Sequence, residues 1–396
     1  MASRKKVRFG IIGSAGLIGN YHAGVLTDGA GPYELTALCD IHKPRLDAQC
    51  QRLGLPGTTE AAELVARDDV DAVIVATPHP LHCAHVTLAV DAGKDVLTEK
   101  PLAATPADAK ALIRAINRRR RIGGIHYQQR GRPATIKAKD MIASGELGRL
   151  LGIRLSGSYY KSNYYYSLGG WRGTWRDEGG GVLINQAPHL MDLFVMIGGM
   201  PTSVLGRTET RLHDIDVEDV AEALLQYPGG GTGYFYATTC EGKPGEMIEV
   251  AGDKGKLVYR DGKLSFYCYE SSLAEFTVSN TDMWKRPELS KKRLRLPKRE
   301  SGHKAIIRNF ARHLLYGEEL IAPAEEGFRS LELANAIWLS AHQEKTVKLP
   351  IDREAYDTFL DGKRREHPDL RQVKEYKRVT DDGGRGAEER SGNTPT

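Results

Sequence analysis

The stretch from Val7 to Gly19 restricts the possible folds more than any other part of the sequence. The apolar run VRFGII (7–12) leads directly into the glycine-rich turn GSAGLIG (13–19), and a helical pattern follows from Asn20. A buried strand, a glycine turn and a helix in this order allow the backbone to approach a pyrophosphate, to which the helix N-terminus offers free N–H groups. The glycine spacing is GxxGxxG rather than the usual GxGxxG, so this loop alone does not identify a dinucleotide site.

Three further apolar runs strengthen this interpretation. They lie at 35–39, 70–76 and 95–98, and each is followed directly by a polar residue, in turn Asp40, Thr77 and Glu99. The carboxyl ends of parallel strands face the crevice where ligands bind. Core packing does not require polar residues or glycine at four successive strand ends. The pattern therefore predicts a doubly wound, dinucleotide-binding α/β domain.

The residue after the second strand bears on which dinucleotide is bound. Asp40 lies at about the distance from Gly19 at which a carboxylate accepts the adenosine ribose hydroxyls, and this favours NAD. His42, Lys43 and Arg45 follow closely and could instead hold the 2′-phosphate of NADP.

The segment VLTEKPL (96–102) places an acid, a lysine and a proline after the fourth strand. Pro101 restricts Lys100 to extended geometry and removes a backbone donor, so the strand must end there. The alternative is that Glu99 and Lys100 form a solvated strand end. The strands upstream argue against that alternative, because they would place Lys100 beside a bound cofactor.

Length and composition limit the classes of protein to consider. A chain of 396 residues is too long for one core and suggests two domains. The net charge of +5 is small, and the basic residues at 285–299 suggest a solvated loop or edge strand rather than a nucleic-acid site. Five cysteines without a CxxC pair suggest reduced thiols in the cytoplasm. The N-terminus shows neither a signal peptide nor a membrane span.

The second half of the chain has a different pattern. From Leu151 short alternating strands are separated by glycine-rich turns, which suggests a largely antiparallel sheet, and 303–316 reads as a helix packing back on the first domain. We expect a dinucleotide-binding domain at 1–128, a substrate and oligomerisation domain at 129–352, and a polar extension at 353–396. From about 378 the extension has too little apolar surface to offset ordering entropy, which predicts disorder.

Several motifs resemble one family. The runs ATPHPLHCAHVTLAVDAGKDVLTEKPLA, GIHYQQRGRPATIKAKDMIASGELGRLLGIR and WRGTWRDEGGGVLINQAPHLMDLF resemble segments of the Gfo/Idh/MocA (glucose-fructose oxidoreductase, inositol dehydrogenase and rhizopine-catabolism) family of nicotinamide oxidoreductases. The resemblance implies an α/β fold with an N-terminal Rossmann domain and a C-terminal α+β domain that has a large, mostly antiparallel open sheet. It also implies NAD as cofactor and a homo-oligomer, dimer or tetramer, formed through the C-terminal sheet.

The resemblance also implies roles for individual residues. Lys100 and His189 are assigned to proton transfer and hydroxyl binding, and Asn185, where the family pattern has a carboxylate, to positioning. Asn185 and His189 would share a helix face at i, i+4, unless Pro188 delays the helix and leaves Asn185 near its N-cap. The expected cofactor-binding residues are Gly13, Ser14, Gly16, Leu17, Ile18, Asp40, Ile41, Arg45, Thr77, Pro78, His79, His82, Glu99, Lys100, Gln128, Trp171 and Arg172. The expected substrate-binding residues are Lys100, Gln129, Lys161, Trp175, Asn185 and His189. No metal site is expected.

A concentration of rings at 159–175 suggests the substrate class. Five tyrosines and two tryptophans alternate there with Lys161 and Arg172. Aromatic faces beside hydrogen-bonding groups suit a pyranose or cyclitol, which has apolar C–H faces and a hydroxyl rim. For the tyrosines, packing of the sheet or of a subunit interface is an equally good explanation. Arg130 is interpreted as a domain-interface ion-pair partner, and His303 as a surface residue.

These observations predict an NAD-dependent oxidoreductase that oxidises a secondary ring hydroxyl of a pyranose sugar, glycoside or cyclitol, with C3 as one candidate position. One alternative is a glycoside-cleaving enzyme that recycles a tightly bound NAD. Another is a non-enzymatic regulator that senses a sugar or NAD on the same fold, although the retention of Lys100 and His189 argues against it. Neither a nucleic acid nor a membrane is expected as a partner.

Overall fold

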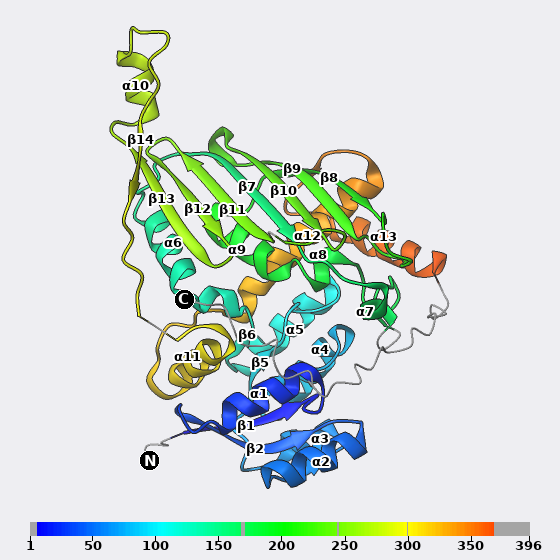
Figure 1. Ribbon diagram of the computed structural model, residues 1–396. Coiled ribbons are helices and arrows are strands. Elements are labelled where there is room, and N and C mark those ends of the chain that lie inside the picture. The colour runs from blue at the N-terminus through cyan, green and yellow to red at the C-terminus, as the bar shows by residue number, and fades with distance from the viewer. Residues whose placement is uncertain (1–5, 168–170, 244, 299, 368–396) are drawn as a thin grey trace, which may run out of the picture.

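The first domain is a parallel sheet whose strands are buried on both faces. In the computed structural model, which describes residues 6–167, 171–243, 245–298 and 300–367, six strands are ordered β3-β2-β1-β4-β5-β6 (Figure 1). Along β4, Ala72 and Ile74 enter one hydrophobic cluster while Val73 and Val75 enter the other. This alternation explains the continuous apolar runs in the sequence. The strands are β1 (Val7–Ile12), β2 (Tyr33–Cys39), β3 (Gly57–Thr58), β4 (Ala72–Val75), β5 (Asp95–Thr98) and β6 (Gly123–Ile125).

Helices connect these strands and cover the sheet. They are α1 (Leu17–Thr27), α2 (Lys43–Leu53), α3 (Ala61–Ala66), α4 (His82–Asp91) and α5 (Pro106–Arg119), with a short 3₁₀ turn η1 (His79–Leu81) before α4. The strand–helix alternation confirms the predicted Rossmann domain. Helix α1 begins three residues earlier than the sequence pattern indicated, directly after Gly16.

The second domain contains a nine-stranded sheet ordered β14-β13-β12-β11-β7-β10-β9-β8-β15. Strands β7 and β10 pair in parallel, and the other pairings between its strands are antiparallel, which confirms the mostly antiparallel open sheet. The strands are β7 (Leu150–Ser158), β8 (Ser203–Glu209), β9 (Val220–Gln226), β10 (Thr232–Thr238), β11 (Glu246–Gly252), β12 (Gly255–Arg260), β13 (Lys263–Tyr269), β14 (Leu289–Lys292) and β15 (Val347–Lys348).

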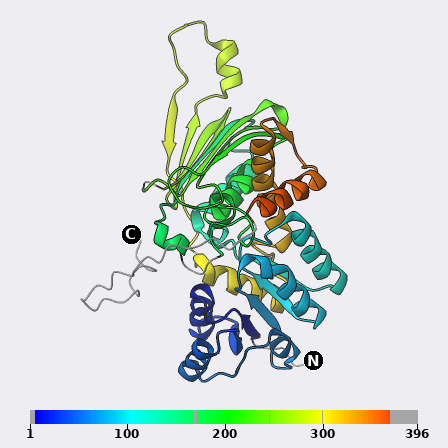
Figure 2. The same cartoon turned by 90° about the vertical axis from the view of Figure 1, so that its right-hand side faces the viewer.

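One side of this sheet is covered by helices (Figure 2). Helix α9 (Pro188–Gly198) packs on β7 and α12 (Gly327–Gln343) packs on β8. The covered side buries Ile153 and Leu155 of β7, while Arg154 between them is exposed. At the far edge, β13, α10 (Leu273–Ser279) and the exposed β14 form an arm that projects beyond the sheet (Figure 1). The basic stretch at 285–298 therefore lies on a solvated arm and edge strand, as predicted.

The two domains are joined by helix packing and a buried ion pair. Helix α11 (Gly302–Tyr316) places Ile306, Ile307 and Phe310 in a cluster of the first sheet, which confirms the helix predicted there. Arg130 lies in a short turn, η2 (Gln128–Gly131), and its guanidinium contacts the Asp192 carboxylate of α9 at 2.6 Å. The interpretation of Arg130 as an interface residue is consistent with this contact.

The remaining elements are α6 (Pro133–Ala143), α7 (Asn163–Ser167), α8 (Val182–Asn185), η3 (Pro228–Gly230), η4 (Ala324–Glu326) and α13 (Arg353–Glu366). Helix α13 buries Tyr356, Phe359 and Leu360, so the predicted polar extension begins with a docked helix rather than at a domain end. The segment predicted to be disordered from 378 lies outside the described residues. All five cysteines are free thiols. Across the described ranges, no helix is both long and apolar enough to cross a membrane.

Candidate active site

The carboxyl ends of β1, β2, β4 and β5 bring their polar residues to one edge of the first sheet. Gly13, directly after β1, has a φ of +84°, and a Cβ there would lie 2.7 Å from the Ala76 carbonyl oxygen. A Cβ on Gly19 would collide with the Gly13 carbonyl oxygen. Both positions therefore require glycine, the first for the turn and the second for close packing of helix on strand.

The start of α1 suits a pyrophosphate. Gly16 is its N-cap and provides no side chain to cover the first-turn N–H groups, which have no partner within the helix. The Asp40 carboxylate accepts hydrogen bonds from the backbone N–H groups of Ala15 and His42, both at 2.9 Å. Leu17 and Ile41 are 95% and 89% exposed beside it. A glycine cradle, a fixed carboxylate and two exposed apolar side chains fit an adenine dinucleotide.

The loop after β4 contains one residue that differs from expectation. His82 was predicted to bind the cofactor, but its ring is completely buried, with Nδ1 2.8 Å from the Pro101 oxygen and Nε2 2.9 Å from the Thr77 oxygen. Burial lowers its pKa. His82 therefore braces two strand-end loops against each other. His79 packs edge-on against the Trp171 ring, with 5.3 Å between the ring centroids. The structure thus brings together two residues that were both predicted to bind the cofactor.

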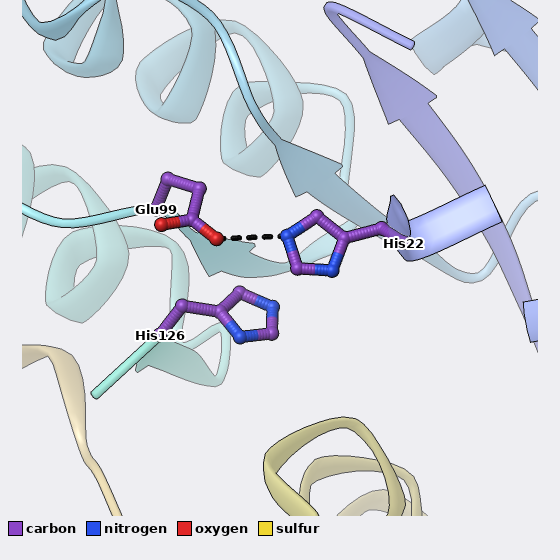
Figure 3. A group of neighbouring side chains, drawn as sticks. All are labelled: His22, Glu99 and His126. Atoms are coloured by element: carbon purple, nitrogen blue, oxygen red, sulfur yellow. Dashed lines mark hydrogen bonds and ion pairs between the residues drawn. The ribbon is translucent and has the colours of Figure 1, made fainter. Parts of the chain in front are cut away.

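The Glu99 side chain points into the protein. Its Oε1 lies 2.8 Å from His22 Nε2, and the ring of His126 stacks on that of His22 with 4.3 Å between centroids (Figure 3). The predicted cofactor contact of Glu99 cannot come from a side chain turned toward His22. His303 is only partly exposed and lies 5.4 Å from the His22 ring, so its interpretation as a surface residue is wrong.

Two groups of side chains have the donor atoms of a metal site. Ligand atoms of His22, Glu99 and His126 lie within 4.8 Å of one another, as do those of His213, Asp219 and Cys240. A metal ligated by imidazole lies in the ring plane. The planes of His22 and His126 are stacked only 29° apart, so they do not meet at a common centre. In the second group, protein atoms already occupy both His213 ring nitrogens and the Asp219 carboxylate.

Lys100 lies at the junction of the two domains. Its Nζ donates a hydrogen bond of 2.6 Å to the backbone oxygen of Asn185. Burial lowers the pKa of Lys100, and the carboxylates of Glu99 and Glu178 oppose that change. A lysine with a lowered pKa can accept a proton near neutral pH.

Asn185 and His189 do not share one continuous helix. Helix α8 ends at Asn185 and α9 begins at Pro188, so the break anticipated at Pro188 is present, although the N-cap of α9 is Ala187. His189 Nε2 lies 3.1 Å from the side-chain nitrogen of Gln128. Burial, together with the charge of Lys100, holds the pKa of His189 well below its ordinary value. The imidazole is therefore neutral and accepts at Nε2 from the Gln128 amide.

Sequence reasoning missed Glu178. This buried carboxyl accepts hydrogen bonds from the Gly173 N–H at 2.6 Å and from the Asn185 side-chain amide. Burial raises the pKa of Glu178 to about 8. The only signal in the sequence was its place in WRDEGGG, where Asp177 beside it was an equal candidate.

The predicted aromatic and cationic residues divide into two sets. The Arg172 guanidinium lies 4.5 Å from the Trp171 ring centroid and 5.0 Å from that of Tyr165, and Lys161 Nζ also lies 5.0 Å from the Tyr165 ring. Trp175 was expected to bind substrate, but it is 6% exposed and packs edge-on against core rings of Trp338 and Phe359.

Gln129 also departs from its predicted role in substrate binding. It is buried, and its amide donates to the Glu246 carboxylate of β11 at 3.0 Å. The preceding residue, Gln128, is the one that faces His189. Gln129 thus contributes to the contact between the domains, because its side chain is already committed to the second sheet.

Comparison with known proteins identifies two domains. Residues 7–127 match a family described as "Oxidoreductase family, NAD-binding Rossmann fold", and residues 135–258 match the GFO/IDH/MocA C-terminal domain. Together the two matches span more than half of the chain.

Individual relatives act on sugars and cyclitols. The 1,5-anhydro-D-fructose reductase of Ensifer adhaerens is 29% identical over 257 residues, which cover 64% of this chain and 76% of the relative. The scyllo-inositol 2-dehydrogenase (NADP(+)) IolW of Bacillus subtilis is 23% identical over 372 residues, covering 88% and 98%. A structure of the WlbA dehydrogenase from Bordetella pertussis in complex with NADH and UDP-GlcNAcA has a TM-score of 0.73 at 27% identity, covering 88% of this chain and all of that one.

Proposed function

Because the chain belongs to the Gfo/Idh/MocA family of NAD-binding oxidoreductases, we propose that it is an NAD-dependent dehydrogenase that oxidises a secondary ring hydroxyl of a pyranose, glycoside or cyclitol. The hydroxyl at C3 of the ring is the first position to test. The observation that supports this most directly is the partly buried Lys100 at the end of β5, held by the Asn185 carbonyl oxygen beside a neutral His189.

The protein side chains supply the acid–base part of the reaction. Bound NAD would accept a hydride from the carbinol carbon. In its neutral form, which burial favours, Lys100 Nζ takes the hydroxyl proton as the carbonyl forms. Neutral His189 accepts a hydrogen bond at Nε2 from the Gln128 amide, and this contact fixes its proton on Nδ1 and orients its ring beside Lys100.

The group of Tyr165, Trp171, Arg172 and Lys161 supports a cyclic polyol as substrate. The Arg172 guanidinium lies within 5.0 Å of the ring centroids of both Tyr165 and Trp171, and Lys161 Nζ lies 5.0 Å from that of Tyr165. Ring faces pack on the apolar C–H faces of a sugar, and cationic side chains donate to its hydroxyls. With Trp175 and Gln129 removed from the predicted set, these four residues form the proposed substrate site together with Lys100, Asn185 and His189.

The direct test is a screen of cyclic polyols and glycosides for formation of free NADH at 340 nm. Turnover with at least one of them is expected. Cleavage of a glycoside without free NADH would indicate the enzyme that recycles its cofactor. Saturable binding of a sugar with neither reaction would indicate a sensor.

We further propose that NAD is preferred over NADP. The Asp40 carboxylate is already fixed by the Ala15 N–H and would repel a 2′-phosphate, while the alternative cation Lys43 pairs with Asp47 at 2.9 Å. We expect more than about tenfold weaker binding of NADP. Fluorescence titration with both cofactors measures the ratio of the two dissociation constants. The Asp40→Ser variant should show a smaller preference for NAD. The name of the Bacillus relative specifies NADP(+) for that enzyme, and tighter binding of NADP by this protein would contradict the proposal.

The open face of the second sheet is the proposed oligomer interface. Leu205, Leu224 and Tyr234 are neighbours in the strand register, and they are 44%, 56% and 39% exposed. Such a row of apolar side chains across three strands is suited to burial against a second copy. Light scattering should show a dimer or tetramer that Leu224→Lys dissociates, whereas Tyr316→Lys on α11 should leave it intact. A monomeric wild type would refute this interface.

A further inference from the structure

The position at which the family pattern has a carboxylate is occupied here by Asn185, but a carboxylate is present one contact away. The Asn185 amide nitrogen donates to Glu178, while the Asn185 backbone oxygen accepts from Lys100 Nζ at 2.6 Å. A single residue thus contacts the proposed base, Lys100, with its backbone and the buried acid Glu178 with its side chain. The Gly173 N–H, at 2.6 Å, fixes the other Glu178 oxygen.

We propose that Glu178 is a positioning residue that orients Asn185 and supplies the negative charge that the family pattern places at position 185. This inference rests on the proposed function. Glu178 acts on Lys100 by charge and by orienting Asn185. No proton passes through the amide, and the hydroxyl proton goes directly to Lys100 Nζ.

Other titratable groups also surround Glu178, and the nearby carboxylate Glu218 has a different role. Glu218 is the other buried carboxylate nearby, but its oxygens accept from the N–H groups of Gly181 and Leu183 at 3.0–3.1 Å, so it caps α8. Arg172, on the same loop, lowers the pKa of Glu178, and Lys100 faces it from the first domain. Tyr165 and Tyr166, from α7, complete the titratable groups around it.

The physical reason for a carboxyl here is the change of charge on Lys100. When neutral Lys100 accepts the hydroxyl proton, a cation forms in a partly buried site. An ionised carboxylate nearby stabilises that cation and raises the pKa of Lys100, while burial lowers it. Burial raises the pKa of Glu178 to about 8, so this carboxyl is ionised, and stabilises the Lys100 cation, above about pH 8.

The test first removes the carboxylate at position 178 and then restores one at position 185. In Glu178→Gln we expect kcat to fall by about 10- to 100-fold with unchanged NAD affinity. The rise of kcat/KM with pH, which follows deprotonation of Lys100, should move to lower pH by about one unit. The reciprocal variant E178Q/N185D returns a carboxylate to position 185 and should recover most of both losses. Asp177→Asn changes the adjacent, half-buried carboxylate and should have no effect.

A second measurement does not depend on turnover. Reductive ¹³C-methylation of the lysines, with the Lys100 signal assigned by its loss in Lys100→Met, gives the pKa of Lys100 by NMR in each variant. We expect a lower Lys100 pKa in E178Q and its recovery in E178Q/N185D. This readout separates failure of the inference from failure of the proposed function, because it requires no substrate.

Two results would overturn the inference. The first is an E178Q enzyme whose pH profile and Lys100 titration match those of the wild type. If E178Q does not fold, Glu178→Asp and the reciprocal variant decide the question. The second result is a folded E178Q/N185D enzyme in which the Lys100 pKa remains low, which would leave Glu178 with a structural role alone.

Discussion

Two buried carboxyls, one from each domain, act on Lys100 by charge, and their environments move their pKa values in opposite directions. On the first-domain side, burial alone would raise the pKa of Glu99, but the hydrogen bond from His22 holds it well below the ordinary range. On the second-domain side, burial dominates and raises the pKa of Glu178 to about 8, because its partners are a backbone N–H and an amide. The hydrogen-bond partner, rather than the depth of burial, therefore decides the direction in which the pKa of a buried acid moves.

The largest expected effect comes from the residue between the two carboxyls. Lys100→Met keeps the length of the side chain and removes its charge and its capacity for proton transfer. We expect kcat to fall by about 10²- to 10⁴-fold while NAD still binds. Steady-state kinetics on the best substrate and a cofactor titration measure both quantities. A variant that retains more than a tenth of the wild-type kcat would show that Lys100 is not the base.

Removing the Glu99–His22 hydrogen bond in the first domain should act mainly on stability. Glu99→Ala leaves the buried His22 ring nitrogen without its partner, and we expect the free energy of unfolding to fall by about 3 kcal/mol. Urea unfolding measures this loss. In a double-mutant cycle, Glu99→Ala should lower the free energy of unfolding by a smaller amount when His22→Ala is already present. Additive costs would mean that the 2.8 Å contact contributes little.

The stacked histidine beneath Glu99 should make stability depend on pH. Burial lowers the pKa of His126 well below its ordinary value of 6.5, so below about pH 6.5 the unfolded chain binds a proton that the folded protein does not. Stability should therefore fall on acidification from pH 6.5 to 5. His126→Phe keeps a ring against His22 and should flatten the slope by at most about 1.4 kcal/mol per pH unit. Unfolding at several pH values measures it, with the exposed His342→Phe as the control. Equal slopes in both variants would exclude His126 as a source.

The sequence by itself determined the arrangement of the first domain. Apolar runs of strand length, a glycine turn and a polar residue at each strand end are local features. In a parallel sheet, these features predict how the strands are connected and that their polar ends lie at the same edge of the sheet. This is why Gly13, Asp40 and Lys100 could be placed beside one another before any coordinates were known. The alternation of the second domain similarly predicted most strands of its sheet, although β8 and β15 were missed and β14 was expected only as a loop or an edge strand.

The tertiary structure decided whether the side chain of each motif residue points into the site or into the core. Trp171 and Trp175 lie four positions apart in one aromatic segment, yet the first meets Arg172 at the site and the second packs in the core. Gln128 and Gln129 are adjacent, yet the first contacts His189 at the site and the second contacts Glu246 of β11. These directions depend on backbone turns that non-local packing fixes. Glu178 could be identified only from the fold, since a carboxyl becomes notable when burial and its neighbours change its charge, and both come from residues distant in sequence.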